Sequence, residues 1–381
     1  MSLSDVIKAE ARRLGFQFSG ITTPEPPPHF NVFEDWLASG RHAQMGYLAT
    51  ERSRKRRADP RQILPECRSI LVLGMRYADP HRVTVTPDEP AAGGPRGRIA
   101  AYAWGDDYHD VLPERLQALV AFIEDQVGKP VPSRWYTDTG PILERDLAQR
   151  AGLGWTGKNT LLINPDQGSY FLLAEILLGI DLDPDPPFSA DLCGSCTRCL
   201  EACPTACILP DRTLDAGRCI SYLTIELKGA IPVEMRPQTG EWIFGCDICQ
   251  EVCPWNIRFS TPEHEPAFAS RPEAARPGLQ QELRLTQEAF NRKFKGSPVK
   301  RAKRRGYLRN VAVALGNTGD ASVVPDLIQA LQQDPEPLVR AHAAWALGRL
   351  GGELARQALV EAEKTEVEPE VLEEIRACLY E

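Results

Sequence analysis

Apolar positions in the first 180 residues follow the spacing of helices in some segments and of strands in others. Residues 3–16, LSDVIKAEARRLGF, carry apolar side chains three and four positions apart, which predicts a helix ending near Gly15. Residues 69–77, SILVLGMRY, are almost continuously apolar and predict a buried strand. Residues 111–128, VLPERLQALVAFIEDQVG, return to helical spacing with Pro113 near the start. Because helices and strands mix, we expect an α/β domain.

This domain is predicted to continue to residue 182. Residues 137–163, TDTGPILERDLAQRAGLGWTGKNTLLI, predict a turn, a helix that opens at Pro141, a glycine-rich loop and a short apolar run. Residues 170–180, YFLLAEILLGI, form the last apolar run of the segment. From residue 183 the composition changes to proline, cysteine and short connections, which marks a domain boundary.

The C-terminal 80 residues contain an internal repeat. The sequence LRNVAVALGNTGD from Leu308 is echoed by VRAHAAWALGRLGG from Val339, and VVPDLIQALQQ between them predicts a second helix. Stacked helical pairs with this period form a short α-solenoid, and we expect a basic N-terminal helix to cap it. The chain is therefore predicted to be an α+β multidomain protein with an α/β domain (1–182), a cysteine-rich module (183–265) and a basic linker with helical repeats (266–381).

The cysteines of this 381-residue chain are concentrated in the middle module. Nine of the eleven lie between Cys193 and Cys253. The longest apolar stretch is about half the ~20 residues of a membrane span, and no apolar segment follows the N-terminal MSLSDVIKAE, so we expect a cytoplasmic protein without membrane segments. In a reducing cytosol, clustered cysteines are more often metal ligands than disulfides.

The spacing of these cysteines is that of two-cluster ferredoxins. Residues 193–204, CGSCTRCLEACP, contain a complete CxxCxxCxxxCP run, whose fourth cysteine typically ligates the other cluster. Residues 246–254, CDICQEVCP, contain a run that is one cysteine short. The crosswise rule predicts one 4Fe-4S cluster on Cys193, Cys196, Cys199 and Cys253, and a second on Cys203, Cys246, Cys249 and one further residue.

Two cysteines are candidates for that last ligand, Cys219 and Cys207. We favour Cys219, because Cys207 follows Cys203 by only four residues. The alternative for the whole set is a pair of structural zinc sites, whose usual signature is paired CxxC motifs. Two clusters in one small module carry single electrons, so such a pair requires an acceptor.

Two basic segments lie on a chain of net charge -8. Residues 292–309, RKFKGSPVKRAKRRGYLR, contain nine basic and no acidic residues, and residues 52–61, RSRKRRADPR, contain six basic residues and one acidic residue. Both segments have a plain interpretation as solvated surface. A phosphate-binding role is favoured for the first, because basic residues along a solenoid form an extended surface, and is left open for the second.

Single residues ahead of Pro141 and around His109 suggest further chemistry. Asp138 in WYTDTGP is either an acid near a helix N-terminus or a proton donor at a reducing centre, and the residues alone favour the former. The segment AWGDDYHD has Asp107 and His109 in DxH order but lacks the glycine that completes DxHxxG. A histidine ligand on cobalamin is therefore not supported.

Several motifs together resemble the epoxyqueuosine reductase family, which catalyses the last step of queuosine synthesis in tRNA. They are YTDTGPILERDLAQRAGLGWTGKNTLLI, CGSCTRCLEACPTACI, RCISYLTIELKGAIP, GCDICQEVCPWN and the HEAT-like tail. The resemblance implies a cobalamin-dependent enzyme related to reductive dehalogenases, with a nitroreductase-like cobalamin domain, a two-cluster ferredoxin-like module and a C-terminal HEAT-like α-solenoid. It implies removal of the epoxide oxygen from epoxyqueuosine at the wobble position of tRNA.

The resemblance also implies roles for particular residues. Asp138 becomes the proton donor, Cys219 the missing cluster ligand and Cys207 a bystander, and cobalt carries no protein histidine. Residues implied near the cofactor are Tyr108, His109, Lys158, Asn159 and Asp247. The residues expected to bind the phosphates of the anticodon stem-loop are Lys300, Arg301, Lys303, Arg304 and Arg305.

The expected partners are a tRNA and an external electron donor, and the expected state is a monomer. One alternative is a reductive dehalogenase-like cobalamin and iron-sulfur enzyme acting on a small organic substrate, which would not need a basic solenoid. The other is a zinc-bound, non-enzymatic tRNA adaptor, which would be colourless.

Overall fold

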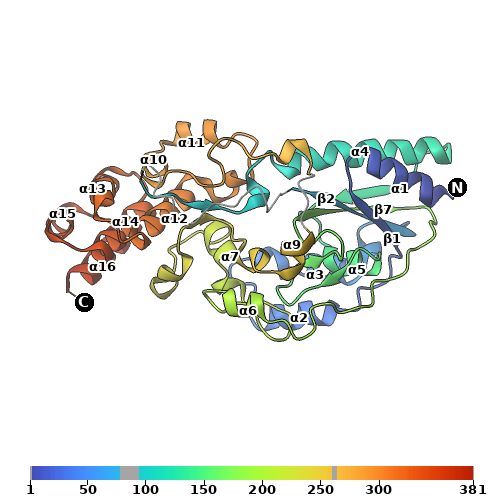
Figure 1. Ribbon diagram of the computed structural model, residues 1–381, viewed down its shortest axis with the longest axis horizontal. Helices are drawn as coiled ribbons and strands as arrows, with labels where there is room; N and C mark the ends of the chain where they lie inside the picture. The colour runs from blue at the N-terminus through green and yellow to red at the C-terminus, as the bar shows by residue number, and fades with distance from the viewer. Residues whose placement is uncertain (1, 78–93, 260–263, 381) are drawn as a thin grey trace. The chain divides into compact units, whose positions relative to one another are not determined.

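The computed structural model describes residues 2–77, 94–259 and 264–380, and these form two compact units (Figure 1). Within the described residues, the first unit contains 2–77, 106–217, 248–259 and 264–269. The second unit contains 94–105, 218–247 and 270–380. The cysteine-rich segment expected at 183–265 is thus divided between the units, because its middle part packs with the C-terminal helices.

A four-stranded sheet forms the centre of the first unit. Its order is β1 (Phe18–Thr22), β2 (Ser69–Arg76), β7 (Phe171–Leu178) and β4 (Ser133–Tyr136), and every pair is antiparallel. The strand predicted at 69–77 is confirmed as β2. The apolar run at 170–180, for which no element was predicted, forms β7, and these two strands are the central ones. Central position explains their continuous apolar sequence, since both faces of a covered sheet are buried.

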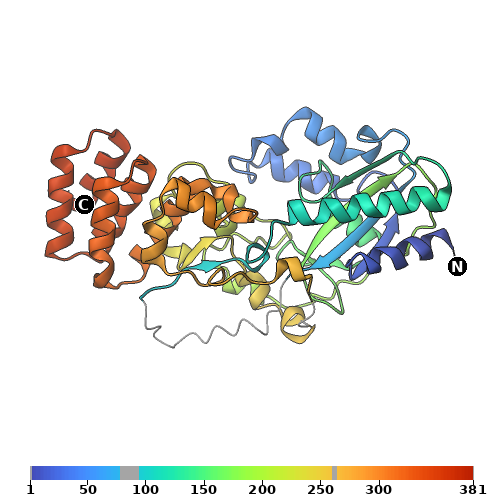
Figure 2. The ribbon, with the colours of Figure 1, turned by 90° about the horizontal axis from the view of Figure 1, so that it is seen from above.

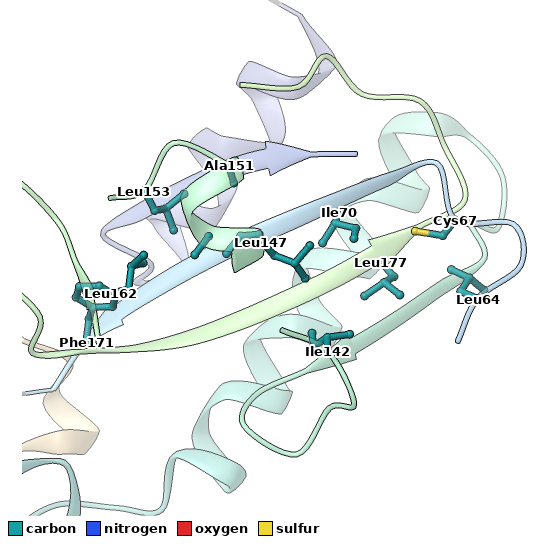
Figure 3. Packing of buried hydrophobic residues seen from close by; sticks show 12 residues of the cluster. Leu64, Cys67, Ile70, Ile142, Leu147, Ala151, Leu153, Leu162, Phe171 and Leu177 are labelled. Atoms are coloured by element: carbon teal, nitrogen blue, oxygen red, sulfur yellow. The ribbon is translucent and has the colours of Figure 1, made fainter. Parts of the chain in front are cut away.

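Helices cover both faces of this sheet. Helices α1 (Leu3–Arg13) and α4 (Tyr108–Val127) lie on one face, and α5 (Glu144–Arg150) lies on the other (Figures 1 and 2). On the α5 face, Leu147 packs with Ile70 of β2 and Leu177 of β7 in one buried cluster (Figure 3). That cluster fixes α5, and the loop before it, against the end of β4.

Two helix starts differ from the sequence prediction. Helix α4 begins at Tyr108, because the side chain of Asp107 accepts a hydrogen bond from the His109 backbone N–H at 3.0 Å and caps it. Helix α5 begins at Glu144, so the predicted start at Pro141 is wrong. Asp138 adopts a left-handed φ of 57°, and the chain makes a turn before the helix can begin.

The remaining elements of the first unit are short, and two of its helices contain motif cysteines, Cys199 and Cys249. They are α2 (Phe30–Ala38), α3 (Glu51–Ala58), a hairpin of β5 (Trp155–Thr156) and β6 (Leu162–Ile163), α6 (Arg198–Ala202), α8 (Ile248–Glu251) and α9 (Pro254–Phe259).

The second unit is a helical stack joined to a small parallel pair of strands. The pair is β3 (Arg98–Ile99) and β8 (Trp242–Phe244), and the helices before the stack are α7 (Ile220–Ile225), α10 (Leu279–Leu283) and α11 (Gln287–Lys293). The stack contains α12 (Lys303–Asn317), α13 (Val324–Gln333), α14 (Pro337–Leu350), α15 (Glu353–Thr365) and α16 (Pro369–Tyr380).

The stack confirms the predicted α-solenoid. Helices α12, α14 and α16 contact one another in turn, and α13 and α15 lie against them as a second layer. The glycine that recurs in the repeat has a packing reason: a Cβ on Gly316 would lie 2.9 Å from Ala346, and one on Gly348 would lie 2.6 Å from the Cys378 sulfur. Glycine therefore allows each helix of this layer to approach the next closely.

The predicted basic capping helix is not a single helix. Residues 292–293 end α11, a 3-10 turn covers Pro298–Ala302, and α12 begins at Lys303. Among the described residues, no helix combines the length and apolar character needed to cross a bilayer.

Candidate functional site

Four cysteines from the two ferredoxin-like runs line one cavity in the first unit. Cys193, Cys196, Cys199 and Cys253 surround a volume of about 250 Å³, together with apolar side chains of α9 such as Trp255. These are the four residues that the crosswise rule assigns to one cluster. The structure brings them together from segments more than 50 residues apart.

Neighbouring donors support this cavity. The indole N–H of Trp155 donates to the Cys193 sulfur at 3.4 Å, and Lys158 Nζ donates to the carbonyls of Gly194 at 2.7 Å and Cys196 at 3.0 Å. Asn159 also lines the cavity, and its Nδ2 lies 3.5 Å from the Cys249 carbonyl. Lys158 and Asn159, predicted for the cofactor pocket, thus hold the cysteine loops, where a cation and N–H donors suit an anionic thiolate cluster.

The cavity supplies the four thiols that a 4Fe-4S cluster needs, together with an apolar lining. Burial raises the pKa of both Cys199 and Cys253, so these thiols need a cationic group to become thiolates.

The cysteines predicted for the second cluster lie in both units. Cys203 ends α6 in the first unit, and its sulfur lies 3.5 Å from that of Cys207. The Cys207 thiol is the main cause that lowers the pKa of Cys203 to about 5, which favours the thiolate that iron binds. Cys207 therefore supports Cys203 by a hydrogen bond.

In the second unit, Cys219 is the residue before α7, and Cys246 follows β8. The Gly245 N–H donates to Thr224 Oγ1 of α7 at 2.9 Å, which ties the loop of Cys246 to the helix that follows Cys219. Cys249 lies in α8 of the first unit.

Asp138 lies in the loop after β4 with its carboxyl in contact with two aromatic side chains. The Tyr108 hydroxyl donates to Asp138 Oδ2 at 2.9 Å, and His109 Nε2 lies 3.7 Å from the same oxygen. The Asp138 side chain is 65% exposed, so it remains accessible to a substrate. The structure thus brings together Asp138, Tyr108 and His109.

His109 is held as a cation at this site. Its Nδ1 donates to Asp107 Oδ1 at 2.9 Å, and this contact, followed by the one to Asp138, raises the pKa of His109 to about 9. Both ring nitrogens of His109 thus face carboxylate oxygens, one on Asp107 and one on Asp138. A protonated imidazole in this position stabilises the carboxylate that remains after Asp138 gives up a proton.

Two glutamates behind Asp138 were not predicted from the sequence. Glu144 Oε1 accepts a hydrogen bond from the Asp138 backbone N–H at 2.8 Å. Burial and the Asp138 charge raise the pKa of Glu144 to about 7. Glu175 in β7 is fully buried, and burial raises its pKa well above the ordinary value. A lone glutamate inside the apolar run YFLLAEILL was the available signal.

Asp247 has a structural contact in the other unit. Its side chain is buried and accepts a hydrogen bond from the Ala101 backbone N–H at 2.6 Å. It therefore does not share a compact unit with the other residues predicted for the cofactor pocket.

The predicted phosphate-binding residues divide by burial. Lys300, Arg301, Lys303 and Arg305 are exposed. Arg304 is only 7% exposed, and its guanidinium donates to both carboxylate oxygens of Asp334 at 3.2 and 2.5 Å. The prediction for Arg304 is therefore wrong, because a phosphate cannot reach it.

Other basic residues lie near Arg301 and Lys303 in the second unit and on α3 in the first unit. Burial lowers the pKa of Lys228; the charge of Glu226 opposes this shift, and those of Arg301 and Lys303 add to it. Lys228 is exposed and was not predicted. In the first unit, α3 presents Arg52, Lys55 and Arg56 around a shallow surface depression.

Three family models match the chain. Residues 57–139 match the family described as epoxyqueuosine reductase QueG, DUF1730. Residues 192–256 match a 4Fe-4S double cluster binding domain, and residues 303–379 match HEAT repeats. The last two matches cover the cysteine runs and the helical stack described above.

Relatives match over nearly the full length. The epoxyqueuosine reductase of Pseudomonas aeruginosa is 40% identical over 353 residues, which cover 92% of this chain and 95% of that protein. A crystal structure of epoxyqueuosine reductase with an epoxyqueuosine-modified tRNA-Tyr stem loop superposes with a TM-score of 0.89 at 32% identity, covering 99% and 98% of the two chains.

A structure of the Bacillus subtilis epoxyqueuosine reductase, at 33% identity, superposes with a TM-score of 0.87 and covers 99% of this chain and 98% of that one. It is described with its catalytic aspartate loop swung out of the active site. Identity at this level and coverage over both chains establish that this chain belongs to the epoxyqueuosine reductase family.

Proposed function

We propose that this protein reduces epoxyqueuosine to queuosine at the wobble position of a tRNA, the last step of queuosine synthesis. The observation that carries the proposal is membership in the family at 40% identity, combined with an accessible carboxyl group at Asp138. Removing the epoxide oxygen as water consumes two electrons and two protons, so the site needs a reductant and an acid.

The cysteines are proposed to hold two 4Fe-4S clusters. One would use Cys193, Cys196, Cys199 and Cys253, whose shared cavity supports this set. The other would use Cys203, Cys219, Cys246 and Cys249. An external donor would supply electrons one at a time to this pair of clusters.

The reducing cofactor is proposed to be cobalamin, bound without a protein histidine on cobalt. The contacts of His109 support this, because both of its ring nitrogens face the carboxylates of Asp107 and Asp138. When bound, low-valent cobalamin supplies a strong nucleophile beside the epoxide. Tyr108 and His109 hold the Asp138 carboxyl in place at this site.

Asp138 is proposed to protonate the oxygen released from the epoxide. Ring opening leaves an alkoxide, and a positioned carboxylic acid is a suitable proton donor. The position of Asp138 on an irregular loop agrees with the loop-borne catalytic aspartate of the Bacillus subtilis relative. The carboxylate that remains is stabilised by His109 and the Tyr108 hydroxyl.

The tRNA is proposed to bind the basic surface that begins the helical stack. Lys300, Arg301, Lys303 and Arg305 are exposed there, and Lys228 adds to the positive potential. Lys and Arg side chains on such a surface bind the phosphates of an anticodon stem-loop. We further propose that the protein works as a cytoplasmic monomer.

Anaerobic turnover of epoxyqueuosine-containing tRNA, with and without added cobalamin, tests the proposal. We expect queuosine only when cobalamin is present and the iron-sulfur clusters are reduced. Failure to convert this tRNA with both cofactors loaded would reject the function. Iron content and the visible spectrum check the loading, since iron-sulfur protein is brown and zinc protein is colourless.

A further inference from the structure

The reaction needs more protons than Asp138 holds. The first proton converts the alkoxide of the opened epoxide to a hydroxyl group, and the second leaves with that group as water when the carbon–carbon double bond forms. A single carboxylic acid supplies one of the two. A second proton must therefore reach the site within one turnover.

Glu175 lies in β7, which pairs with β4, the strand before the Asp138 loop, and its carboxyl group has no partner in the described part of the chain that would stabilise a charge. It lies in β7 between Leu173 and Leu177, which face the buried cluster beneath α5, and its register partners are Val72 and Tyr136. Its side chain is 0% exposed, and neither carboxyl oxygen has a hydrogen-bond partner among the described residues. A carboxyl group in such surroundings keeps its proton, because nothing compensates the charged form.

Glu144 connects this buried acid to the catalytic loop. It is the first residue of α5, on the same face of the sheet as Glu175, and it binds the Asp138 backbone N–H at 2.8 Å. Helix α5, which begins at Glu144, packs against β7, and burial followed by the charges of Glu144 and Asp138 raises the pKa of Glu175. Like charges so close disfavour simultaneous ionisation, so the group retains protons at neutral pH.

Two cations also face the carboxyls. Arg145 of α5 and Arg57 of α3 both favour the ionised form of Glu144, but more weakly than burial and Asp138 oppose it. Arg57 donates to the Gly140 carbonyl at 3.4 Å and thereby also holds the catalytic loop.

We propose that Glu144 and Glu175 form a proton reservoir that recharges Asp138 within one turnover; this inference rests on the proposed function. Asp138 gives its proton to the alkoxide and becomes a carboxylate. Glu144 then transfers its proton to Asp138, and Glu175 transfers its proton to Glu144. Asp138 gives the second proton to the departing hydroxyl group, and solvent restores both protons after the tRNA leaves.

His109 is the competing source, since it also carries a proton beside Asp138. It is paired with the carboxylates of Asp107 and Asp138, and its pKa of about 9 makes it the weaker acid. A donor whose pKa lies near the working pH transfers its proton more readily. Glu144, with a pKa of about 7, meets that condition.

The test compares Glu175→Gln and Glu144→Gln with Glu114→Gln, which alters an exposed carboxylate of α4. Glutamine at 144 can still accept the Asp138 N–H hydrogen bond, so it removes the stored proton and keeps the position. Single-turnover rates would be measured on reduced, cofactor-loaded enzyme. At about pH 7, close to the pKa of Glu144, we expect both variants to be slower than the parent by about tenfold or more, with a much smaller loss at about pH 5, where solvent supplies protons.

An equal loss at both pH values would indicate a structural role and overturn the proposal, as would rates equal to those of Glu114→Gln. Infrared spectra provide a readout independent of activity: a protonated carboxyl band of the parent at neutral pH should disappear in Glu175→Gln. If the parent itself fails to convert the tRNA, the proposed function fails. If the parent is active and lacks that band, only the reservoir fails.

Discussion

Asp334 of the helical stack and Glu175 of the first unit are both buried carboxyl groups, but their surroundings are opposite. In the helical stack, Asp334 is paired with Arg304, Glu366 with Arg340 and Glu374 with Arg236. In the first unit, Glu175 is fully buried and has no hydrogen-bond partner among the described residues. Paired carboxylates hold the stack together as ions, whereas an unpaired one stores a proton. The presence or absence of a cationic partner thus distinguishes Asp334 from Glu175.

The largest expected effect is on turnover, from changing the candidate proton donor Asp138. Asp138→Asn removes the acidic proton and keeps the size of the side chain, so we expect turnover to fall by about 10²–10⁴-fold. Iron content, cobalamin binding and tRNA affinity should remain as in the parent. Rates measured anaerobically on matched cofactor-loaded samples check this. Turnover similar to the parent's would remove Asp138 from the mechanism.

Breaking the buried Arg304–Asp334 ion pair should cause a large loss of stability, without a direct effect on the reaction. Arg304→Ala leaves Asp334 buried and unpaired, and breaking such a pair typically costs about 3–5 kcal/mol. Arg305→Ala, its exposed neighbour, is the matched control and should change stability by less than about 0.5 kcal/mol. Thermal and denaturant unfolding measure both. Equal effects of the two substitutions would contradict the assignment of Arg304 to the interior.

The exposed residues beside Arg304 should affect RNA binding instead. Replacing Lys300, Lys303 and Arg305 with glutamine should weaken tRNA binding and reduce the slope of log affinity against log salt by about 2 to 3, since each phosphate contact contributes about 0.7–0.9. Lys364→Gln, in α15, is the control. Affinity titrations at several salt concentrations give the slope. An unchanged slope would show that these residues are only solvated surface.

The two kinds of carboxyl should also respond to pH in opposite directions. The Arg340 contact lowers the pKa of Glu366 to about 2, so its stabilisation is present above its ordinary pKa of 4.5 and is lost as pH falls toward 2. Glu366→Gln should therefore reduce the loss of stability in acid. Melting temperatures between about pH 3 and pH 7 test this.

Glu175 has a raised pKa, so its effect has the other sign. The folded state favours the protonated form, and stability is lost as pH rises above 4.5 toward the folded pKa. Glu175→Gln should stabilise the protein by about 1 kcal/mol or more at neutral pH, and the gain should grow with rising pH. A gain that is absent or independent of pH would show that Glu175 is not held protonated.

Much of the fold and of the candidate site could be predicted from the sequence, because those features depend on the spacing of residues along the chain. Apolar periodicity located α1, β2 and the repeats, and the cysteine spacing selected the four residues that line one cavity. The start of α5 was missed, because the left-handed backbone at Asp138 and the hydrogen bond to Glu144 replace the expected first turn. Those contacts join residues whose relation is not periodic.

The sequence by itself determined the helical repeats, the cluster-type cysteine spacing and the presence of an aspartate ahead of α5, since each is a pattern along the chain. Only the tertiary structure decided that Arg304 is internal while Arg305 is exposed, and that Glu175 lies unpaired behind Asp138. The physical reason is that charge and protonation depend on burial and on partners from distant segments. Residue type alone specifies neither.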